Sequence, residues 1–245
     1  AGEVPVAPPR PVGVEQNLVI TQLGWAQKVG FVHDNVSTDK RDPTINSKGP
    51  VYGVGGSFLV ITDPVKNESR EIRVPRNDDS PYSNTHNPML DDKNRVWMTS
   101  SVRGSDNPDW CKDSDHPSVK RFPIQRSTRQ MSFYDANKDE MVTYDTCYAT
   151  HHLQFMDDKN DTLYISGDSN VIGWIDTKEF DKSGDKKAAQ AWCPTILDTN
   201  GDGKIGEYVE PREPVDPTKD KRIAGFAYGI ITNPIDNTVW FARTS

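Results

Sequence analysis

One stretch of sequence recurs along this chain, and the repeat limits the possible folds more than any other feature. Residues 85–100 read THNPMLDDKNRVWMTS, residues 151–166 read HHLQFMDDKNDTLYIS, and residues 228–243 read YGIITNPIDNTVWFAR. Each copy consists of a strand, a polar turn and a second strand that carries an aromatic residue. Aligning the two DDKN turns places His86 on His152, and the third copy places Tyr228 near the same position. Such a repeat predicts an architecture in which similar β-units are stacked.

A second pattern completes the repeating unit. Residues 57–74 and 131–147 each contain an apolar strand, an Asp, a turn and an alternating strand, and residues 170–180 open in the same way. Each unit is therefore predicted to hold four short strands in two hairpins. Because four antiparallel strands cannot bury their apolar face alone, such units stack around an axis, which predicts a β-propeller. A β-sandwich, with turns at about 8–12 residue spacing, is the alternative.

Composition favours the same all-β class. The 17 glycines and 18 prolines are scattered between short apolar runs, as expected for many short strands. The only helical candidate is the charged stretch at residues 177–191. Trp97 and Trp240 occupy one repeat position and are predicted to lie in the core between blades.

The repeats account for residues 14–245 as about three to four blades with long loop insertions. The copies lie farther apart than the roughly 40–50 residues of an ordinary propeller blade. Since closed propellers typically have 4–8 blades, we expect an incomplete propeller, either a fragment or a piece that a second chain completes. Residues 1–13, AGEVPVAPPRPVG, form a Pro-rich segment. They fit the mature N-terminus left by a cleaved signal peptide, or an arbitrary chain boundary.

Charge and hydropathy exclude some partners. The 29 Lys and Arg against 36 Asp and Glu give a net charge of −7, and the mean hydropathy is −0.74. Because no basic block is present, nucleic acid and anionic membrane surfaces are not expected partners. A membrane helix needs roughly 20 consecutive apolar residues, and the sequence has no such run, so membrane insertion is not expected either.

The chain has three cysteines, and none of them forms a CxxC pair. We predict a disulfide between Cys111 and Cys147, which would contribute roughly 3–4 kcal/mol to stability, and a single Cys193. A catalytic cysteine is the alternative. The disulfide favours a secreted or periplasmic protein.

Histidines mark the candidate active site. His86 and His152 share a repeat register at the start of an innermost strand, and His151 is adjacent. Imidazoles that converge there would act as general acid and base, or as ligands of a divalent metal. Neighbouring residues on a strand point to opposite faces, so His151 and His152 cannot both face the channel unless the chain is irregular there. Alternatively, these histidines only hydrogen-bond the backbone of neighbouring blades.

A loop within residues 193–223 resembles a calcium site. In DTNGDGKIGE, residues 198–207, oxygen side chains stand at positions 1, 3 and 5 and a glycine at position 6, the spacing of an EF-hand loop. The EF-hand glutamate of position 12 is replaced by Val209. The predicted Ca²⁺ ligands are Asp198, Asn200, Asp202, the carbonyl of Lys204, and a carboxylate from Glu207 or Glu210. The role of the ion would be structural, and a plain loop of Asx turns is the alternative.

The repeat register, a His followed by an Asp turn, a strand with Trp and a Tyr-Asp strand, resembles the streptogramin lyase (virginiamycin B lyase) type of seven-bladed propeller. It looks closest to the N-terminal half of secreted or periplasmic proteins described as streptogramin-lyase-like or carboxypeptidase-regulatory-like. The matching stretches cover most of residues 30–245 and lie at residues 38–53, 85–100, 107–123, 145–155 and 196–223. The resemblance implies a propeller with a ligand site on one face of its central channel.

Two functions of different class follow. The first is a secreted or periplasmic scaffold that binds an unidentified small molecule or protein partner and is stabilised by the calcium loop. The alternative is a lyase of the streptogramin-lyase type, in which His86, His151 and His152 move a proton while a divalent ion such as Mg²⁺ polarises a carbonyl. The sequence contains no GxGxxG, Walker, GxSxG or HExxH motif, so it gives no support to nucleotide binding or the common hydrolase mechanisms.

Overall fold

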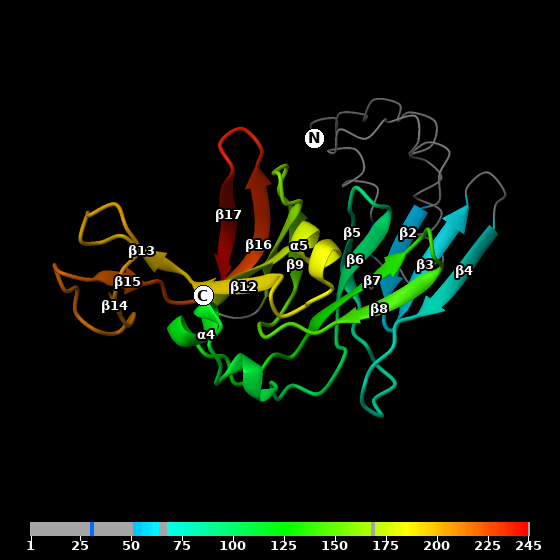
Figure 1. Cartoon of the computed structure of the whole chain (residues 1–245), viewed down its shortest axis with the longest axis horizontal. Coiled ribbons are helices and arrows are strands. Elements are labelled where there is room, and N and C mark those ends of the chain that lie inside the picture. Colours follow the sequence, from blue (N-terminus) through cyan, green and yellow to red (C-terminus); the bar gives the residue numbers. More distant parts are fainter. Residues whose placement is uncertain (1–29, 32–50, 64–67, 168–169, 245) are drawn as a thin grey trace, which may run out of the picture.

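The computed structural model describes residues 30–31, 51–63, 68–167 and 170–244. The chain is all-β, with 43% strand and 8% helix, as the sequence predicted. Its strands form three antiparallel sheets of four strands, one mixed sheet of three strands and a two-stranded hairpin (Figure 1), and in the described residues they do not close into one sheet. The Pro-rich segment at residues 1–13 lies outside the described residues.

Three sheets have four strands each, and in all three the strands are paired in sequence order with antiparallel neighbours. The first contains β1 (Gly30–Phe31), β2 (Val51–Gly55), β3 (Phe58–Asp63) and β4 (Glu68–Arg73). The second contains β5 (His86–Leu90), β6 (Arg95–Ser100), β7 (Gln130–Asp135) and β8 (Glu140–Tyr144). The third contains β9 (His152–Phe155), β10 (Thr162–Ser166), β11 (Val171–Asp176) and β12 (Gln190–Pro194). The predicted unit of four strands in two hairpins is thus confirmed in the second and third sheets.

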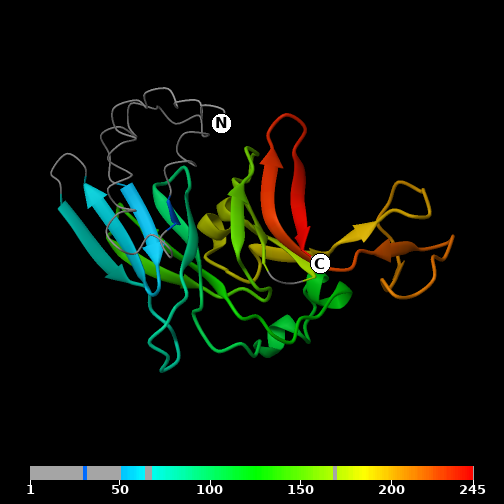
Figure 2. The ribbon, with the colours of Figure 1, turned by 180° about the vertical axis from the view of Figure 1, so that it is seen from behind.

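The remaining strands form two smaller units. The hairpin consists of β16 (Phe226–Asn233) and β17 (Thr238–Thr244). The small sheet consists of β13 (Ile196–Leu197), β15 (Asp220–Arg222) and β14 (Tyr208–Val209), and its β14–β15 pair is parallel. Seen from behind in Figure 2, this small sheet lies at the opposite end of the molecule from β4.

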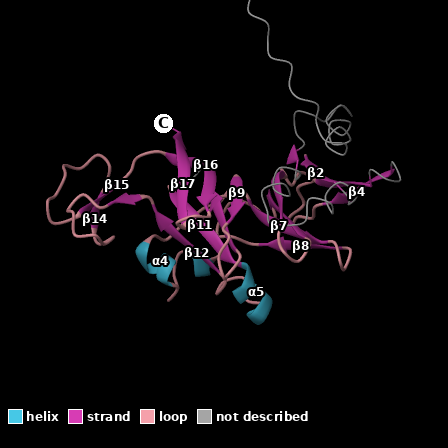
Figure 3. Cartoon of the chain, turned by 90° about the horizontal axis from the view of Figure 1, so that it is seen from above, coloured by secondary structure: helices cyan, strands magenta, loops and turns pink. Residues whose placement is uncertain are grey.

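The first strands of successive sheets are neighbours. β5 lies against β1 and against β9, and β9 in turn lies against β16. Side chains fasten these strands together: Leu153 N–H donates to Asn87 Oδ1 at 2.9 Å, and Thr232 Oγ1 donates to the carbonyl of Phe155 at 2.7 Å. The sheets and the hairpin therefore follow one another across the molecule (Figure 3) with their first strands in contact.

Strand β6 supplies side chains to two apolar cores, because successive residues of a strand point to opposite faces. Val96 and Met98 pack in the core shared with the first sheet, beside Leu59. Trp97 packs in the core shared with the third sheet, where its ring lies 4.6 Å from that of Phe133. All six residues of β6 are buried, so this strand is the centre of the described fold.

The prediction for the two repeated tryptophans is half right. Trp97 is fully buried, as expected, but Trp240 is 64% exposed. The reason is that β17 has only β16 as a neighbour among the described strands, whereas Trp97 stands between two four-stranded sheets.

The polar turn before β6 is fixed by a buried ion-pair network. Asp91 accepts hydrogen bonds from the backbone N–H of Arg95, from Arg95 Nε at 2.5 Å and from Trp97 Nε1 at 2.9 Å. The Arg95 guanidinium also contacts Asp181 at 2.5 Å. Burial lowers the pKa of Arg95, but the two carboxylates outweigh this effect and raise it overall. The network joins the second sheet to helix α5 (Thr177–Ser183), which lies in the stretch predicted to be helical.

The loop between β6 and β7 is held by the predicted disulfide. Cys111 and Cys147 are bonded across a sequence separation of 36 residues, and both are fully buried in the core. This bond excludes a catalytic role for either thiol in the oxidised protein. Cys193 is the single free cysteine and is half-buried.

The same loop contains two short helical segments that the sequence analysis did not predict, η1 (Asp109–Cys111) and α4 (Pro117–Arg121). His116 caps α4 by accepting a hydrogen bond from Ser118 N–H. The signal was present, since proline is favoured at the first position of a helix. Neither these segments nor α5 has the length and apolar character needed to cross a membrane, and no other described helix does.

Candidate functional site

The three histidines singled out in the sequence lie together. His86 opens β5, His152 opens β9, and His151 directly precedes β9. One ring nitrogen from each lies within 4.8 Å of those of the other two. The ring centroids of His86 and His151 are 4.7 Å apart, and those of His151 and His152 are 4.4 Å apart. All three residues are half-buried, so the cluster is reachable from solvent while its rings are held by neighbours.

The adjacent pair His151 and His152 share the cluster because the chain is irregular there. β9 begins only at His152, so His151 lies in a bend outside the strand and does not follow the alternation of side chains along it. Its backbone N–H nevertheless donates to the carbonyl of Ser166 at 2.8 Å, which holds it beside β10. This bend is the irregularity that the sequence required if both histidines were to point to the same side.

The neighbouring first strands are irregular at the same level. The pairing of β5 with β6 shifts register between His86 and Met89, and the pairing of β16 with β17 shifts between Ala227 and Ile230. Register shifts of this kind redirect side chains and are over-represented next to functional sites. Here they occur beside His86 and around Tyr228, the residue of the third repeat that aligns with the histidines.

Hydrogen bonds fix the backbone around the cluster. The hydroxyl of Thr99 on β6 lies 3.1 Å from the carbonyl oxygen of His86 and 3.4 Å from that of His151. Asn87, which has a positive φ of 46°, accepts the Leu153 N–H described above. The two strands that carry the histidines are therefore tied to each other and to β6.

Tyr228 forms one wall of the cluster. Its ring centroid lies 4.8 Å from the rings of both His151 and His152, at steep interplanar angles of 84° and 65°. Its carbonyl oxygen accepts a hydrogen bond from the Ser166 hydroxyl, and the residue is 40% exposed. The repeat alignment had placed Tyr228 in this register without giving it a role.

The donor set indicates which ion the cluster suits. Imidazole nitrogen is a favourable ligand for zinc, copper, iron and nickel, whereas Mg²⁺ takes oxygen ligands in an octahedral arrangement. No Asp or Glu belongs to this group of potential ligands. The three histidines therefore fit a transition metal better than the Mg²⁺ expected for a lyase. Three histidines also leave a coordination position for water or substrate, as in catalytic zinc sites.

The loop at residues 198–207 has the backbone hydrogen bonds of a folded turn. The Asp198 carboxylate accepts the N–H groups of Gly201 at 2.7 Å and Gly203 at 2.9 Å. Asn200 accepts the N–H of Asp202 at 3.0 Å, and Asp202 accepts that of Lys204 at 2.8 Å. Gly203 has a φ of 75°, which explains the glycine at position 6. This geometry is compatible with both a calcium loop and a plain loop of Asx turns.

The two glutamates suggested as the last calcium ligand are engaged elsewhere. Glu207 pairs with Lys219 at 3.3 Å, and Glu210 pairs with Arg222 at 2.5 Å. A residue that the sequence did not indicate also contacts the loop. Asp220 is fully buried, accepts the N–H of Gly206 through Oδ2 at 2.6 Å, and has an Oδ1 with no hydrogen-bond partner. Asp220 lies too far along the sequence from residues 198–207 to belong to a recognisable spacing motif.

No family model, curated protein or solved structure matches this chain. The fold itself places the protein in the all-β class, with several antiparallel sheets in succession. Its candidate site is the histidine cluster where the first strands of the second and third sheets meet.

Proposed function

We propose that this chain is part of a β-propeller, of the kind that its resemblance to streptogramin lyases implies. Three successive four-stranded sheets, each with its first strand beside the first strand of the next, support this proposal. In it, β16 and β17 are the inner half of a fourth blade, and the histidine cluster lies at one end of the central channel. A secreted or periplasmic location agrees with the buried disulfide.

The function that the site supports best is binding of a divalent transition metal, which in turn holds a ligand on the propeller. The observation that carries this proposal is the convergence of three imidazoles within 4.8 Å. They come from two neighbouring strands whose backbones are tied together, so the ligands are positioned before the metal arrives. Preorganised ligands raise affinity because little ordering remains to be done on binding.

A transition metal held by three histidines takes at least one further ligand. Three neutral imidazoles do not compensate a divalent charge, so an anionic oxygen donor is favoured at the open position. Tyr228 lies beside His151 and His152 and is partly exposed, and it is placed to contact a molecule bound there. The protein would thus act as a binding scaffold for a small oxyanion or a partner's carboxylate.

A lyase of the streptogramin-lyase type remains the second candidate. The same convergence favours it, because His86, His151 and His152 could move a proton, while a divalent ion, if held there, would supply polarisation of a carbonyl. Among the residues that the structure describes, no carboxylate joins the cluster, and this weakens the case for a lyase. Metal-dependent opening of a streptogramin B lactone by the purified protein would favour the lyase over the scaffold.

Metal binding is tested by titrating the apoprotein with Co²⁺ and Zn²⁺ at neutral pH. We expect one equivalent to bind, with visible absorption from Co²⁺ that reports nitrogen coordination. His86→Ala and His152→Ala should each weaken binding by about 10-fold to 100-fold or more, the range seen even for residues that only support a ligand. Acidification should release the metal, because imidazoles must be neutral to bind it.

The matched control is the double variant Asp198→Ala with Asp202→Ala, which removes the acidic loop and leaves the histidines intact. It should bind Co²⁺ as the unmodified protein does. If the unmodified protein binds no more Co²⁺ than His86→Ala, while circular dichroism shows both folded, the proposal is wrong.

A further inference from the structure

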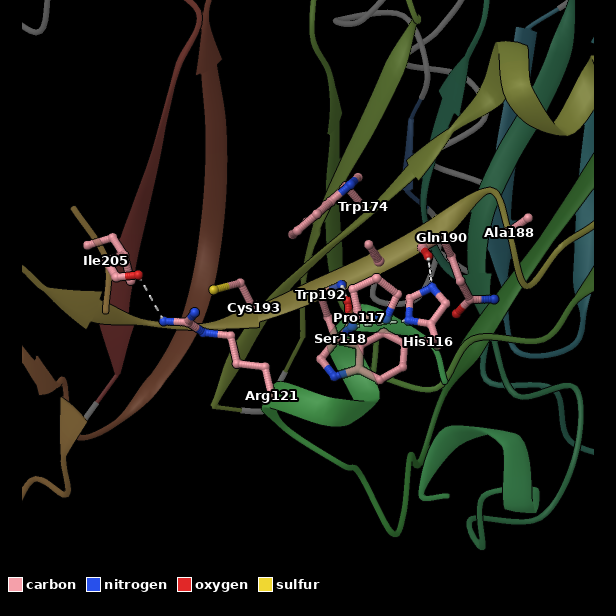
Figure 4. Close-up of a pocket in the computed structure, with 11 residues that line it drawn as sticks. His116, Pro117, Ser118, Arg121, Trp174, Ala188, Gln190, Trp192, Cys193 and Ile205 are labelled. Carbon is pink, nitrogen blue, oxygen red and sulfur yellow. Dashed lines mark hydrogen bonds between the residues drawn. The ribbon is translucent and has the colours of Figure 1, made fainter. Parts of the chain in front are cut away.

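A groove lies beside β12, at the opposite edge of the third sheet from β9 and the histidine cluster; Figure 4 shows the residues that line it. It runs between α4 and the outward face of β11 and β12, and its cavity volume is about 620 Å³. That volume falls within the roughly 300–1,000 Å³ of small-molecule sites. Five of its lining side chains define its chemistry: Arg121, Trp174, Ala191, Cys193 and Ile205.

Along one wall of the groove, helix α4 covers the edge of the third sheet where a peptide could otherwise add as a further strand. β12 is the edge strand of its sheet, but α4 covers that edge. Ser118 Oγ accepts the N–H of Trp192 at 3.0 Å, and His116 Nε2 donates to the carbonyl of Gln190 at 3.0 Å. The His116 ring also stacks on Trp192, with centroids 5.3 Å apart. Because the carbonyl of Gln190 and the N–H of Trp192 are already engaged, these two groups are not available to an added strand, and we expect a ligand here to bind through side chains.

The floor of the groove is apolar. Ala191 pairs with Trp174 across β11 and β12, and Cys193 pairs with Ile172. Trp174, Ala191 and Cys193 are all only half-buried, so an indole face, a methyl group and a thiol are available to a ligand. A flat apolar body would bury these surfaces and gain about 25 cal/mol for each Å² removed from water.

The positively charged guanidinium of Arg121 lies at one end of this apolar floor. Arg121 ends α4, and its Nη2 donates to the carbonyl oxygens of Gly206 at 2.9 Å and Ile205 at 3.3 Å (Figure 4). In the part of the chain that the structure describes, Arg121 forms no ion pair. By contrast, the arginines at 70, 76, 95, 103, 126 and 222 each pair with an acidic side chain. Carbonyl oxygens orient the guanidinium but do not neutralise its charge.

We propose that this groove binds a small amphiphilic anion. Its flat apolar body lies over Trp174, Ala191 and Cys193, and its carboxylate, sulfonate or phosphate group pairs with Arg121. The carbonyls of Ile205 and Gly206 hold the guanidinium in place, so its remaining N–H groups are preorganised for the anion. This site is independent of the histidine cluster and does not rest on metal binding.

Cys193 provides a local reporter of occupancy. It is the only cysteine outside the disulfide, so a thiol reagent used without reductant modifies this residue alone. Burial raises the pKa of the Cys193 thiol, with a smaller opposing effect from the charge of Arg121. The reaction should therefore be followed at mildly alkaline pH, where more of the thiolate is present.

The test compares two probes, 8-anilinonaphthalene-1-sulfonate and the uncharged N-phenyl-1-naphthylamine. The sulfonate should slow modification of Cys193 at lower concentrations than the uncharged compound. Arg121→Gln should weaken protection by the sulfonate about tenfold or more, the range for a lost charged hydrogen bond, and leave protection by the uncharged probe unchanged. Trp174→Ala should weaken protection by both probes.

Two further variants make the result decisive. Arg126→Gln removes a 70% exposed arginine of the same loop, which pairs with Asp106, and should change nothing. Arg121→Lys keeps the charge and should retain most of the protection. If the sulfonate does not slow modification of Cys193, or protects Arg121→Gln as well as the unmodified protein, the proposal is overturned.

Discussion

At the scale of single residues, Gly173 shows how the third sheet depends on a missing side chain. The ring of Tyr148 lies against the backbone of β11, and a Cβ at Gly173 would stand 2.2–2.4 Å from three of its atoms. Tyr148 is fully buried, and its hydroxyl donates to the carbonyl of Trp174 at 3.1 Å. Since Tyr148 directly follows the disulfide at Cys147, this contact anchors the loop to the sheet.

Gly173→Ala should lower the free energy of unfolding by about 2 kcal/mol or more, because the methyl group forces a buried ring out of a packed position. Chemical denaturation with urea measures the change. Gly104→Ala is the control: its Cβ would come no closer than 3.9 Å to another group, so stability should change by less than about 0.5 kcal/mol. Equal stability of the two variants would contradict this account of Gly173.

At the scale of elements, the hydrophobic pattern and the repeat predicted the four-stranded units, because alternation of apolar residues is a local signal. The exact register of the two repeated turns, however, could not be predicted from the local sequence. The DDKN turns align in sequence, yet the hydrogen-bonding equivalent of Asp91 is Asp158: each accepts the N–H groups two and four residues ahead. The aligned residue, Asp157, is one position earlier. Bulges and turn lengths, which tertiary packing decides, set this shift.

The candidate site was predictable in part for the same reason. His86 and His152 were found because the repeat register brings the starts of first strands together. The contribution of His151 depends on a bend before β9 that the sequence does not specify. Asp220 and the groove beside α4 involve residues far apart in sequence, so no spacing could have indicated them.

The small sheet of β13, β14 and β15 carries a prediction about calcium. The loop at residues 198–207 presents Asp198, Asn200 and Asp202, and the buried Asp220 reaches it through Gly206. A bound Ca²⁺ would offset the negative charges of Asp198 and Asp202. Calcium at about 100 times its dissociation constant should therefore stabilise the fold by about 2.7 kcal/mol, and a chelator should reverse the shift in melting temperature.

Asp198→Ala with Asp202→Ala should abolish the calcium effect. Asp236→Ala is the matched control, because Asp236 makes a similar turn by accepting the N–H of Thr238 in the hairpin and should leave the calcium shift intact. A melting temperature that is the same with calcium and with chelator would leave only the interpretation as a loop of Asx turns.

At the scale of the whole molecule, exposed apolar side chains are concentrated at the hairpin. Nine large hydrophobic residues are exposed in the described part of the chain, and five of them belong to β16, β17 and the turn between them. These five are Phe226, Tyr228, Ile231, Ile235 and Trp240. The first three sheets have four strands each, whereas in the described residues this hairpin has two, and β17 pairs with β16 alone. An apolar face beside an open strand edge is a surface that pairs with another chain.

We therefore predict that the protein associates through this hairpin as its concentration rises, which sedimentation velocity would measure. Ile231 and Trp240 are 62% and 64% exposed, and burying a large apolar side chain contributes about 1.5–3 kcal/mol. Ile231→Lys with Trp240→Lys should thus raise the concentration needed for association by at least about tenfold. Leu197→Lys with Val215→Lys, which places the same charges on exposed apolar residues outside the hairpin, should leave association unchanged. A chain that remains monomeric at every concentration, or equal association of the two double variants, would show that this face has no partner in a second copy.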